Sequence, residues 1–115
     1  MSEAKILVID DEKLLRWSMQ QNLSKEGYVV ATAEKGLEGL NLFKEETPDV
    51  TLLDIHLPDV SGITVLQGIK EINKDAIVIM ITAFGDIQTA VKTIKLGAYD
   101  FVEKPFNMDK LKILV

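Results

Sequence analysis

The stretch Val50-Thr51-Leu52-Leu53-Asp54-Ile55-His56-Leu57-Pro58-Asp59 decides the fold, because it joins an apolar, β-rich run to a carboxylate and then to a turn. Residues 50–53 are typical of a buried strand, and Pro58 marks the turn. Asp54 could simply begin that turn, as aspartate often does. A carboxylate at the end of a buried strand contributes little to stability, so its role depends on what gathers around it.

Strand-like and helix-like segments alternate along the whole chain. Apolar runs predict five strands, at residues 6–9, 28–33, 50–53, 77–81 and 99–102. Between them, apolar residues recur at helical spacing in four sets: Leu15, Met19 and Leu23; Leu37, Leu40 and Phe43; Val65, Leu66, Ile69 and Ile72; and Ile87, Ala90, Val91 and Ile94. A last helix beginning near Asn107 would be truncated at Val115. Because strands that are apolar throughout need helices on both faces, we expect an α/β fold with a doubly wound parallel sheet.

The composition narrows the class of protein. The 115 residues suit one domain, and 47% of them are hydrophobic, enough for a core. The net charge is −5 with no basic block, so we expect no direct binding of nucleic acid by this domain. The longest apolar run, residues 76–81, is far shorter than the ~20 residues of a membrane-spanning helix. No signal peptide is recognisable, and the absence of cysteine suits a reducing compartment, so we expect a cytoplasmic protein without membrane contact.

Polar side chains stand at the predicted strand ends. They are Asp10 and Asp11 after the first strand, Asp54 at the third, Thr82 at the fourth and Lys104 after the fifth. Taken singly, each has an ordinary explanation: a helix cap, a turn, a strand residue or a surface lysine. In a parallel sheet, however, the carboxyl ends of the strands share one edge, where ligands bind. Capping and turns give no reason for the lysine, so we expect one site.

The chemistry of this set favours a metal-assisted transfer of phosphate. Three adjacent carboxylates repel one another unless a cation shares the site. Oxygen ligands, no cysteine and a single histidine favour Mg²⁺ over Zn²⁺ or Cu²⁺. A carboxylate beside Mg²⁺ and an ammonium group can attack phosphorus and form an aspartyl phosphate.

These residues stand in motifs that resemble the receiver domain of two-component response regulators. The matching segments span nearly the whole chain: Ile9-Asp10-Asp11, Leu53-Asp54-Ile55, Leu57-Pro58-Asp59-Val60-Ser61-Gly62, Thr82-Ala83, Gly97-Ala98-Tyr99-Asp100-Phe101 and Lys104-Pro105-Phe106. The resemblance implies a flavodoxin-like five-stranded parallel sheet of order 2-1-3-4-5. It also implies a phosphorylation-activated signalling switch. Such a switch catalyses only its own phosphorylation and dephosphorylation, so the resemblance implies that the protein is not an enzyme.

The resemblance implies a role for each site residue. Asp54 would accept the phosphoryl group from a sensor histidine kinase, and Lys104 would pair with the phosphoryl oxygens. Asp11 would bind Mg²⁺ directly, Asp10 mainly through water, and His56 through its backbone carbonyl. Thr82 and Phe101 would form the switch, in which the hydroxyl moves to the phosphoryl group and the ring turns inward.

Further segments are similar to nitrogen-regulator-type activators of the alternative sigma factor: Arg16-Trp17, Thr82-Ala83-Phe84-Gly85, Ala90-Val91-Lys92 and residues 97–101. In that type an ATPase and a DNA-binding domain follow the receiver on the same chain. Residues 1–115 would then be an excised N-terminal receiver domain of a transcription regulator. The resemblance also implies a homodimer through helix 4, strand 5 and helix 5 when phosphorylated.

Other classes of protein are weaker alternatives. A phosphatase of the haloacid-dehalogenase type also uses Mg²⁺ and a strand-end aspartate, but it usually carries a second aspartate where this chain has His56. A flavin or nucleotide carrier lacks its phosphate-binding loop after the first strand. A receiver-like module that is never phosphorylated would have no need of all five site positions.

Two local features of the sequence bear on the Lys104–Pro105 peptide bond and on the lifetime of the aspartyl phosphate. The turn that brings Lys104 back over the sheet favours a cis Lys104–Pro105 bond, at a cost of ~0.5–1 kcal/mol over trans. The resemblance also implies that Phe84 and His56 flank the approach of water to the phosphorus. Phe84 cannot orient a water and a mostly neutral His56 does so weakly, so we expect slow self-dephosphorylation.

Overall fold

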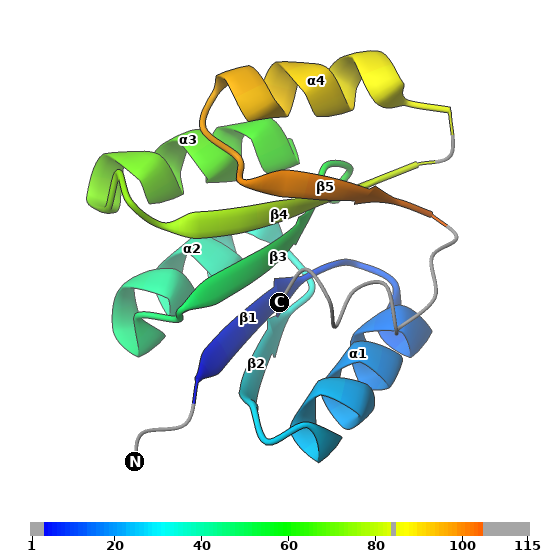
Figure 1. The fold of residues 1–115 in the computed structure, drawn as a ribbon, viewed down its shortest axis with the longest axis vertical. Helices are drawn as coiled ribbons and strands as arrows, with labels where there is room; N and C mark the ends of the chain where they lie inside the picture. The colour runs from blue at the N-terminus through cyan, green and yellow to red at the C-terminus, as the bar shows by residue number, and fades with distance from the viewer. Residues whose placement is uncertain (1–3, 84, 105–115) are drawn as a thin grey trace.

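Five parallel strands form one sheet of order β2-β1-β3-β4-β5 in the computed structural model, which describes residues 4–83 and 85–104 (Figure 1). The strands are β1 (Lys5–Ile9), β2 (Val29–Ala33), β3 (Val50–Asp54), β4 (Ile77–Thr82) and β5 (Asp100–Glu103). All four pairings between neighbouring strands are parallel. The predicted strand order is confirmed, and the strand boundaries agree with the sequence reading to within one residue.

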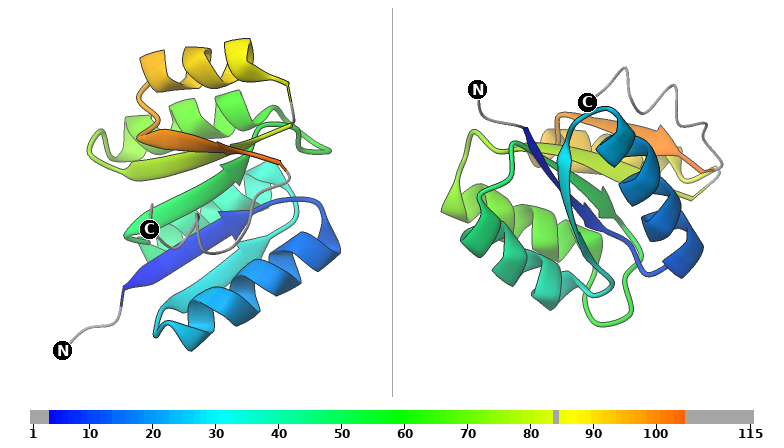
Figure 2. Two further views of the ribbon diagram at one scale, coloured as in Figure 1. Left: turned by 45° about the vertical axis from the view of Figure 1, so that its right-hand side comes forward. Right: turned by 90° about the horizontal axis from the view of Figure 1, so that it is seen from below.

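Helices cover both faces of this sheet. They are α1 (Lys13–Lys25), α2 (Gly36–Glu46), α3 (Gly62–Ile72) and α4 (Ile87–Lys95). Seen from below, α1 lies on one side of the sheet, and α2 and α3 lie on the other (Figure 2). The helix expected near Asn107, the Lys104–Pro105 bond and Phe84 lie outside the described residues.

The core has two halves, one for each face. β3 supplies both, since Leu53 packs in the cluster with α2 and α3, whereas Leu52 packs in the cluster with Met19 and Leu23 of α1. Both leucines are fully buried. A continuous apolar strand therefore serves two helical layers at once, which is the reason the sequence shows no alternation there.

The loop after β3 turns back tightly before α3 begins. A Cβ atom on Gly62 would collide with the backbone carbonyl of Asp54, so this close approach requires glycine. Ser61 caps α3 by accepting a hydrogen bond from the Ile63 amide at 3.1 Å. Asp59 accepts the amides of Gly36 and Leu37 at 2.8 and 3.0 Å, at the start of α2. The loop is thus held by the close packing of Gly62 and by side-chain hydrogen bonds to the amides that begin α2 and α3.

Not every periodic apolar residue is in the core. On α4, Ala90 is buried, but Ile87, Val91 and Ile94 are 39–45% exposed. The spacing of these residues correctly predicted a helix. Ala90 and Thr93 face the sheet, and the larger apolar residues extend the apolar stripe of the helix to the surface. Among the helices of residues 4–83 and 85–104, none has the length and apolarity to cross a membrane.

Candidate functional site

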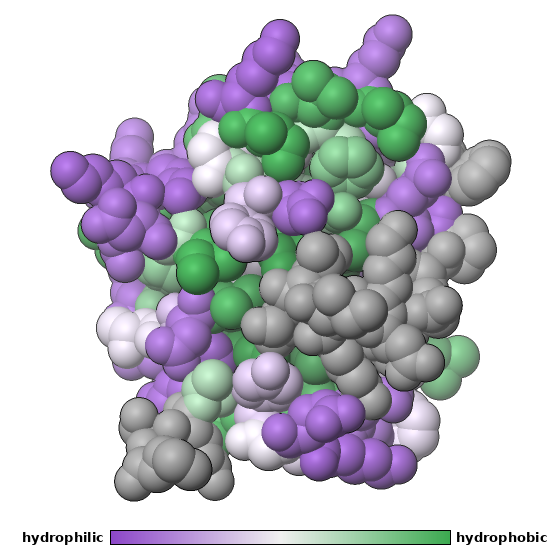
Figure 3. Space-filling model, in the orientation of Figure 1, coloured by the Kyte–Doolittle hydropathy of each residue, from purple (hydrophilic) through white to green (hydrophobic). Residues whose placement is uncertain are grey.

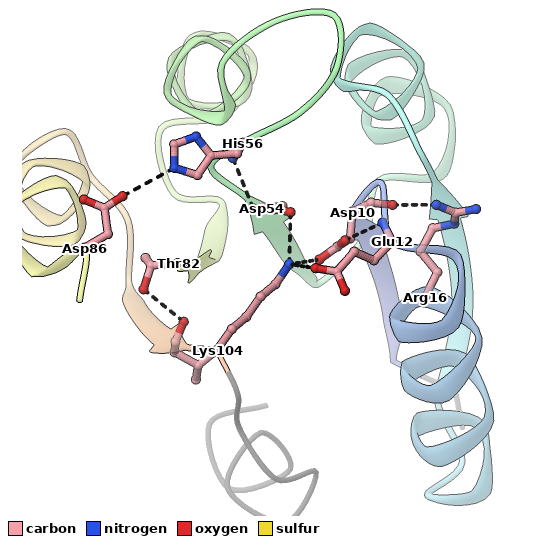
Figure 4. Close-up of polar contacts among 9 residues, drawn as sticks. Asp10, Glu12, Arg16, Asp54, His56, Thr82, Asp86 and Lys104 are labelled. Atoms are coloured by element: carbon pink, nitrogen blue, oxygen red, sulfur yellow. Dashed lines mark hydrogen bonds and ion pairs between the residues drawn. The ribbon is translucent and has the colours of Figure 1, made fainter. Parts of the chain in front are cut away.

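The strand ends meet at one edge of the sheet, as predicted. Asp10 follows β1, Asp54 ends β3, Thr82 ends β4 and Lys104 follows β5. Figure 4 shows the Lys104 side chain reaching from the end of β5 across to Asp54 and Asp10. The register explains this convergence, because Ile9 pairs with Leu53, and Asp54 pairs with Ile81 next to Thr82.

Three carboxylates lie together at this edge. One carboxylate oxygen from each of Asp10, Asp11 and Asp54 lies within 4.8 Å of the others. Asp10 is fully buried and Asp54 is 4% exposed, whereas Asp11 faces solvent. The acidic cluster therefore combines two buried carboxylates with one that solvent can reach.

Lys104 supplies positive charge to this acidic cluster. Its Nζ lies 3.3 Å from Asp54 Oδ2, 3.4 Å from Asp10 Oδ2 and 2.6 Å from Glu12 Oε1. Burial by itself would lower the pKa of Lys104, but the hydrogen bond to Glu12 and the charges of Asp10 and Asp54 outweigh it and raise the pKa. The lysine is therefore a permanent cation at the site.

Burial has the opposite effect on the two inner acids. It raises the pKa of Asp10 to about 6, although the Glu12 amide and Lys104 favour the ionised form. Burial also raises the pKa of Asp54, against the His56 amide, which donates to Asp54 Oδ1 at 3.1 Å, and against Lys104. One ammonium group does not fully compensate the negative charge of these acids, so the acidic cluster could accommodate a further cation.

The donor set fits a hard divalent cation. Asp10 Oδ2 is buried and accepts no hydrogen bond from the described residues, its contact with Lys104 being an ion pair at 3.4 Å. A buried oxygen without a hydrogen-bond donor, beside two further carboxylates, fits the oxygen coordination that Mg²⁺ prefers. Asp10, Asp11 and Asp54 are thus the residues that could hold the ion.

Thr82 and Phe101 lie on neighbouring strands. Thr82 is fully buried, and its hydroxyl donates to the Val102 carbonyl at 3.4 Å, a long hydrogen bond. Phe101 is partly buried against the core cluster of α2 and α3. Because Phe101 pairs with Met80, two residues before Thr82, both side chains point to the same face of the sheet. Their role as a switch stays a prediction.

The His56 ring points away from the carboxylates. Its Nε2 lies 3.4 Å from Asp86 Oδ2, and 70% of the side chain is exposed (Figure 4). The sequence predicts no ligand role for the ring, and the ring contacts Asp86, the residue directly before α4, instead of the acidic cluster. The role of the His56 backbone carbonyl as a ligand stays a prediction.

Sequence reasoning missed several supporting residues. Glu12 pairs with Lys104; Arg16 donates to the Asp10 backbone carbonyl at 2.8 Å and lies 3.8 Å from Glu34; and Glu103 accepts the Gly85 amide at 2.7 Å. Only the position of Glu12, directly after the two acids, offered a signal. The sequence indicates Arg16 only as part of the Arg16-Trp17 motif, and the neighbouring Trp17 is 61% exposed.

Comparison with known proteins agrees with this geometry. Residues 6–115 match the response regulator receiver domain. The chain belongs to this family. The receiver is 39% identical to the chemotaxis protein CheY of Bacillus subtilis, over 93% of this chain and 90% of CheY. It is also 36% identical to the DNA-binding transcriptional regulator NtrC of Escherichia coli, over the whole chain but only 24% of NtrC.

Solved structures give the same answer. The receiver domain of NtrX from Brucella abortus superposes with a TM-score of 0.90 at 39% identity, over 95% of this chain and 92% of that one. The predicted family, its place in two-component systems and the similarity to nitrogen-regulator-type proteins are confirmed. The family match displaces the haloacid-dehalogenase alternative.

Proposed function

We propose that this receiver is a phosphorylation-activated switch, in which Asp54 accepts a phosphoryl group from a sensor histidine kinase. The observation that carries the proposal is the convergence of Asp10, Asp11 and Lys104 on Asp54 at the carboxyl edge of the sheet. Asp54 is the only acid of this cluster that ends a strand and contacts the ammonium group.

The transfer is a displacement at phosphorus. A carboxylate oxygen of Asp54 attacks the phosphorus of the donor and forms the new P–O bond. The bond from phosphorus to the donor breaks, and the donor leaves with its electron pair, as the histidine imidazole of a kinase or as acetate from acetyl phosphate. Lys104 pairs with the phosphoryl oxygens throughout, which stabilises the negative charge on them during the transfer.

Asp10, Asp11, Asp54 and the His56 carbonyl would hold Mg²⁺. When bound, the ion offsets the charge of the carboxylates and polarises the phosphoryl oxygens. The residues of this chain orient the parts: the His56 amide holds one oxygen of Asp54, and the Glu12 amide holds Asp10 at 2.8 Å. Loss of the phosphoryl group by hydrolysis would return the domain to its resting state, so the receiver is not an enzyme with external turnover.

The conformational readout would involve Thr82 and Phe101. The long hydrogen bond of the Thr82 hydroxyl to Val102 is weak enough to be exchanged for a phosphoryl oxygen. Movement of Thr82 would open space for Phe101 on the same face of the sheet. The similarity to NtrC, a DNA-binding transcriptional regulator, supports a DNA-binding output domain on the same chain and a role in transcription regulation. The ATPase domain is what the resemblance to the nitrogen-regulator type implies.

Labelling with acetyl phosphate and Mg²⁺, followed by intact mass, tests the function. The wild type should gain the mass of one phosphoryl group, and Asp54→Ala should gain none. Asp75→Ala, at an exposed acid far along the chain, is the matched control and should label like the wild type. A chelator should stop labelling.

Two results would contradict the proposal. One is labelling of Asp54→Ala at the wild-type level. The other is steady hydrolysis of an unactivated phosphate monoester, which is not a phosphoryl donor in the proposed cycle and would indicate a phosphatase.

A further inference from the structure

Glu12 makes the shortest contact that the structure describes for Lys104. Its Oε1 lies 2.6 Å from Nζ, whereas the oxygens of Asp54 and Asp10 lie at 3.3 and 3.4 Å (Figure 4). The Glu12 side chain is 59% exposed, while those of Asp10 and Asp54 are 0% and 6% exposed. The site lysine is therefore held most closely by the most accessible of its three partners.

An ammonium group has three N–H donors. In the unphosphorylated structure, the Lys104 ammonium donates to Glu12 and Asp54 and lies 3.4 Å from Asp10, so three carboxylates already share its charge. A phosphoryl group on Asp54 would carry a charge of about −2 and would lie beside the same ammonium group. Glu12 would then compete with the phosphoryl oxygens for Lys104.

Of the three carboxylates, Glu12 can leave at the lowest cost. Asp10 is fixed by burial and by the Glu12 amide, and Asp54 is itself the acceptor. The Glu12 carboxylate is largely solvated already, and an exposed ion pair contributes little to stability. Its side chain accepts no capping hydrogen bond at the start of α1, so its movement leaves the helix intact.

We propose that Glu12 holds Lys104 in the unphosphorylated receiver and releases it when Asp54 is phosphorylated, so that the Glu12 carboxylate opposes phosphorylation. Glu12 is thus a positioning residue, which acts through Lys104 and does not touch phosphorus. This inference rests on the function proposed above. It predicts that removing the charge of Glu12 makes the phosphorylated state easier to reach.

The test measures binding of beryllofluoride, a phosphate mimic, at a fixed concentration of Mg²⁺. Glu12→Gln should bind about fivefold more tightly than the wild type, as expected for loss of one competing ion pair. Acetyl phosphate should also label this variant faster. Glu45→Gln removes the same charge from an exposed position on α2 and should bind like the wild type. Circular dichroism of all variants checks that the fold is retained.

The Lys104→Met background separates competition for lysine from simple repulsion. In this background, Glu12→Gln should change the rate of labelling by acetyl phosphate by less than about twofold, because no ammonium remains to compete for. Intact mass counts accumulated product, so a slow rate can still be compared.

Each other outcome has one meaning. Unchanged or weaker binding by Glu12→Gln, with a wild type that is labelled normally, overturns the inference alone. A gain that persists at full size in the Lys104→Met background shows that Glu12 acts by repulsion and overturns the competition. A wild type that is not labelled at all overturns the proposed function itself.

Discussion

Asp10 is the residue where stability and function conflict most directly. Its side chain is fully buried, burial raises its pKa to about 6, and one of its oxygens accepts no hydrogen bond from the described residues. A buried charge without full compensation costs free energy. In the proposed function this carboxylate helps to bind the cation. Its burial lowers the free energy of unfolding of the metal-free domain.

Replacing Asp10 by Asn should therefore stabilise the metal-free domain in a pH-dependent way. Above its ordinary pKa of 3.8, unfolded Asp10 is ionised, whereas folded Asp10 stays protonated until about pH 6. The folded state then binds more protons, so wild-type stability falls as pH rises from about 4 to about 6. The asparagine cannot ionise and escapes this loss. Urea unfolding with a chelator present should show that the advantage of Asp10→Asn grows by ~1 kcal/mol between pH 5 and pH 7.

Added Mg²⁺ provides the control for this prediction. It should stabilise the wild type at pH 7 and stabilise Asp10→Asn less, because the variant lacks one ligand charge. An advantage that does not vary between pH 5 and pH 7 would show that Asp10 titrates normally in the folded domain.

The site residues that could be predicted are those fixed by topology. Asp54, Thr82 and Lys104 follow or end strands, and parallel strands bring such positions to one edge. Glu12, Asp86 and Arg16 could not be assigned in the same way. Their contacts depend on the path of loops and on side-chain rotamers, which no hydrophobic period encodes. The pairing of His56 with Asp86, for example, joins the loop after β3 to the start of α4.

At the scale of elements, the loop between β3 and α3 keeps Asp54 in place through small local contacts. The Gly62 amide donates to the Ile55 carbonyl at 2.6 Å, and Ser61 caps α3. The sequence Asp59-Val60-Ser61-Gly62 was recognisable as a motif, but the capping of α2 by Asp59 was not predicted. That contact joins positions more than twenty residues apart, beyond the reach of local turn rules.

Ser61→Ala should destabilise the domain by ~1 kcal/mol, because the Ile63 amide loses its capping acceptor. Ser24→Ala is the matched control, since Ser24 is exposed inside α1, where alanine favours the helix. Chemical denaturation of both variants measures the difference. Equal stability of the two variants would mean that the cap contributes nothing, whereas lost labelling in a folded Ser61→Ala would place Ser61 in the phosphorylation site.

Hydrophobic period predicted α4 but did not predict which of its apolar residues would be buried. The helix packs on β4 and β5 through Ala90, and its larger residues Ile87, Val91 and Ile94 lie partly in solvent. A hydrophobic period of about 3.6 residues identifies the apolar face of a helix, but it does not identify the element that packs against that face. The exposed apolar residues of α4 can form a surface together with residues outside the helix.

Over the whole molecule, exposed apolar side chains gather on α4 and the segment leading to β5. Figure 3 shows this group along the upper part of the molecule. It comprises Ile87, Val91, Ile94 and Tyr99, which are 39–64% exposed. Contiguous apolar surface of this kind is typical of a site that another protein covers. The group lies beside β5, the strand that carries Phe101.

Phosphorylation should strengthen self-association through this α4–β5 surface. The inward turn of Phe101 that we propose would reshape the surface next to Ile87, Val91 and Ile94. Sedimentation velocity with beryllofluoride and Mg²⁺ should show a shift towards the dimer that is absent without the mimic. Val91→Lys should abolish the shift, because a charge in the centre of the surface opposes its burial. Leu14→Lys, which alters an 80% exposed residue on α1 at the opposite face, should leave it intact. Equal sedimentation with and without the mimic, at concentrations where mimic binding is complete, would rule out coupling between Asp54 and this surface.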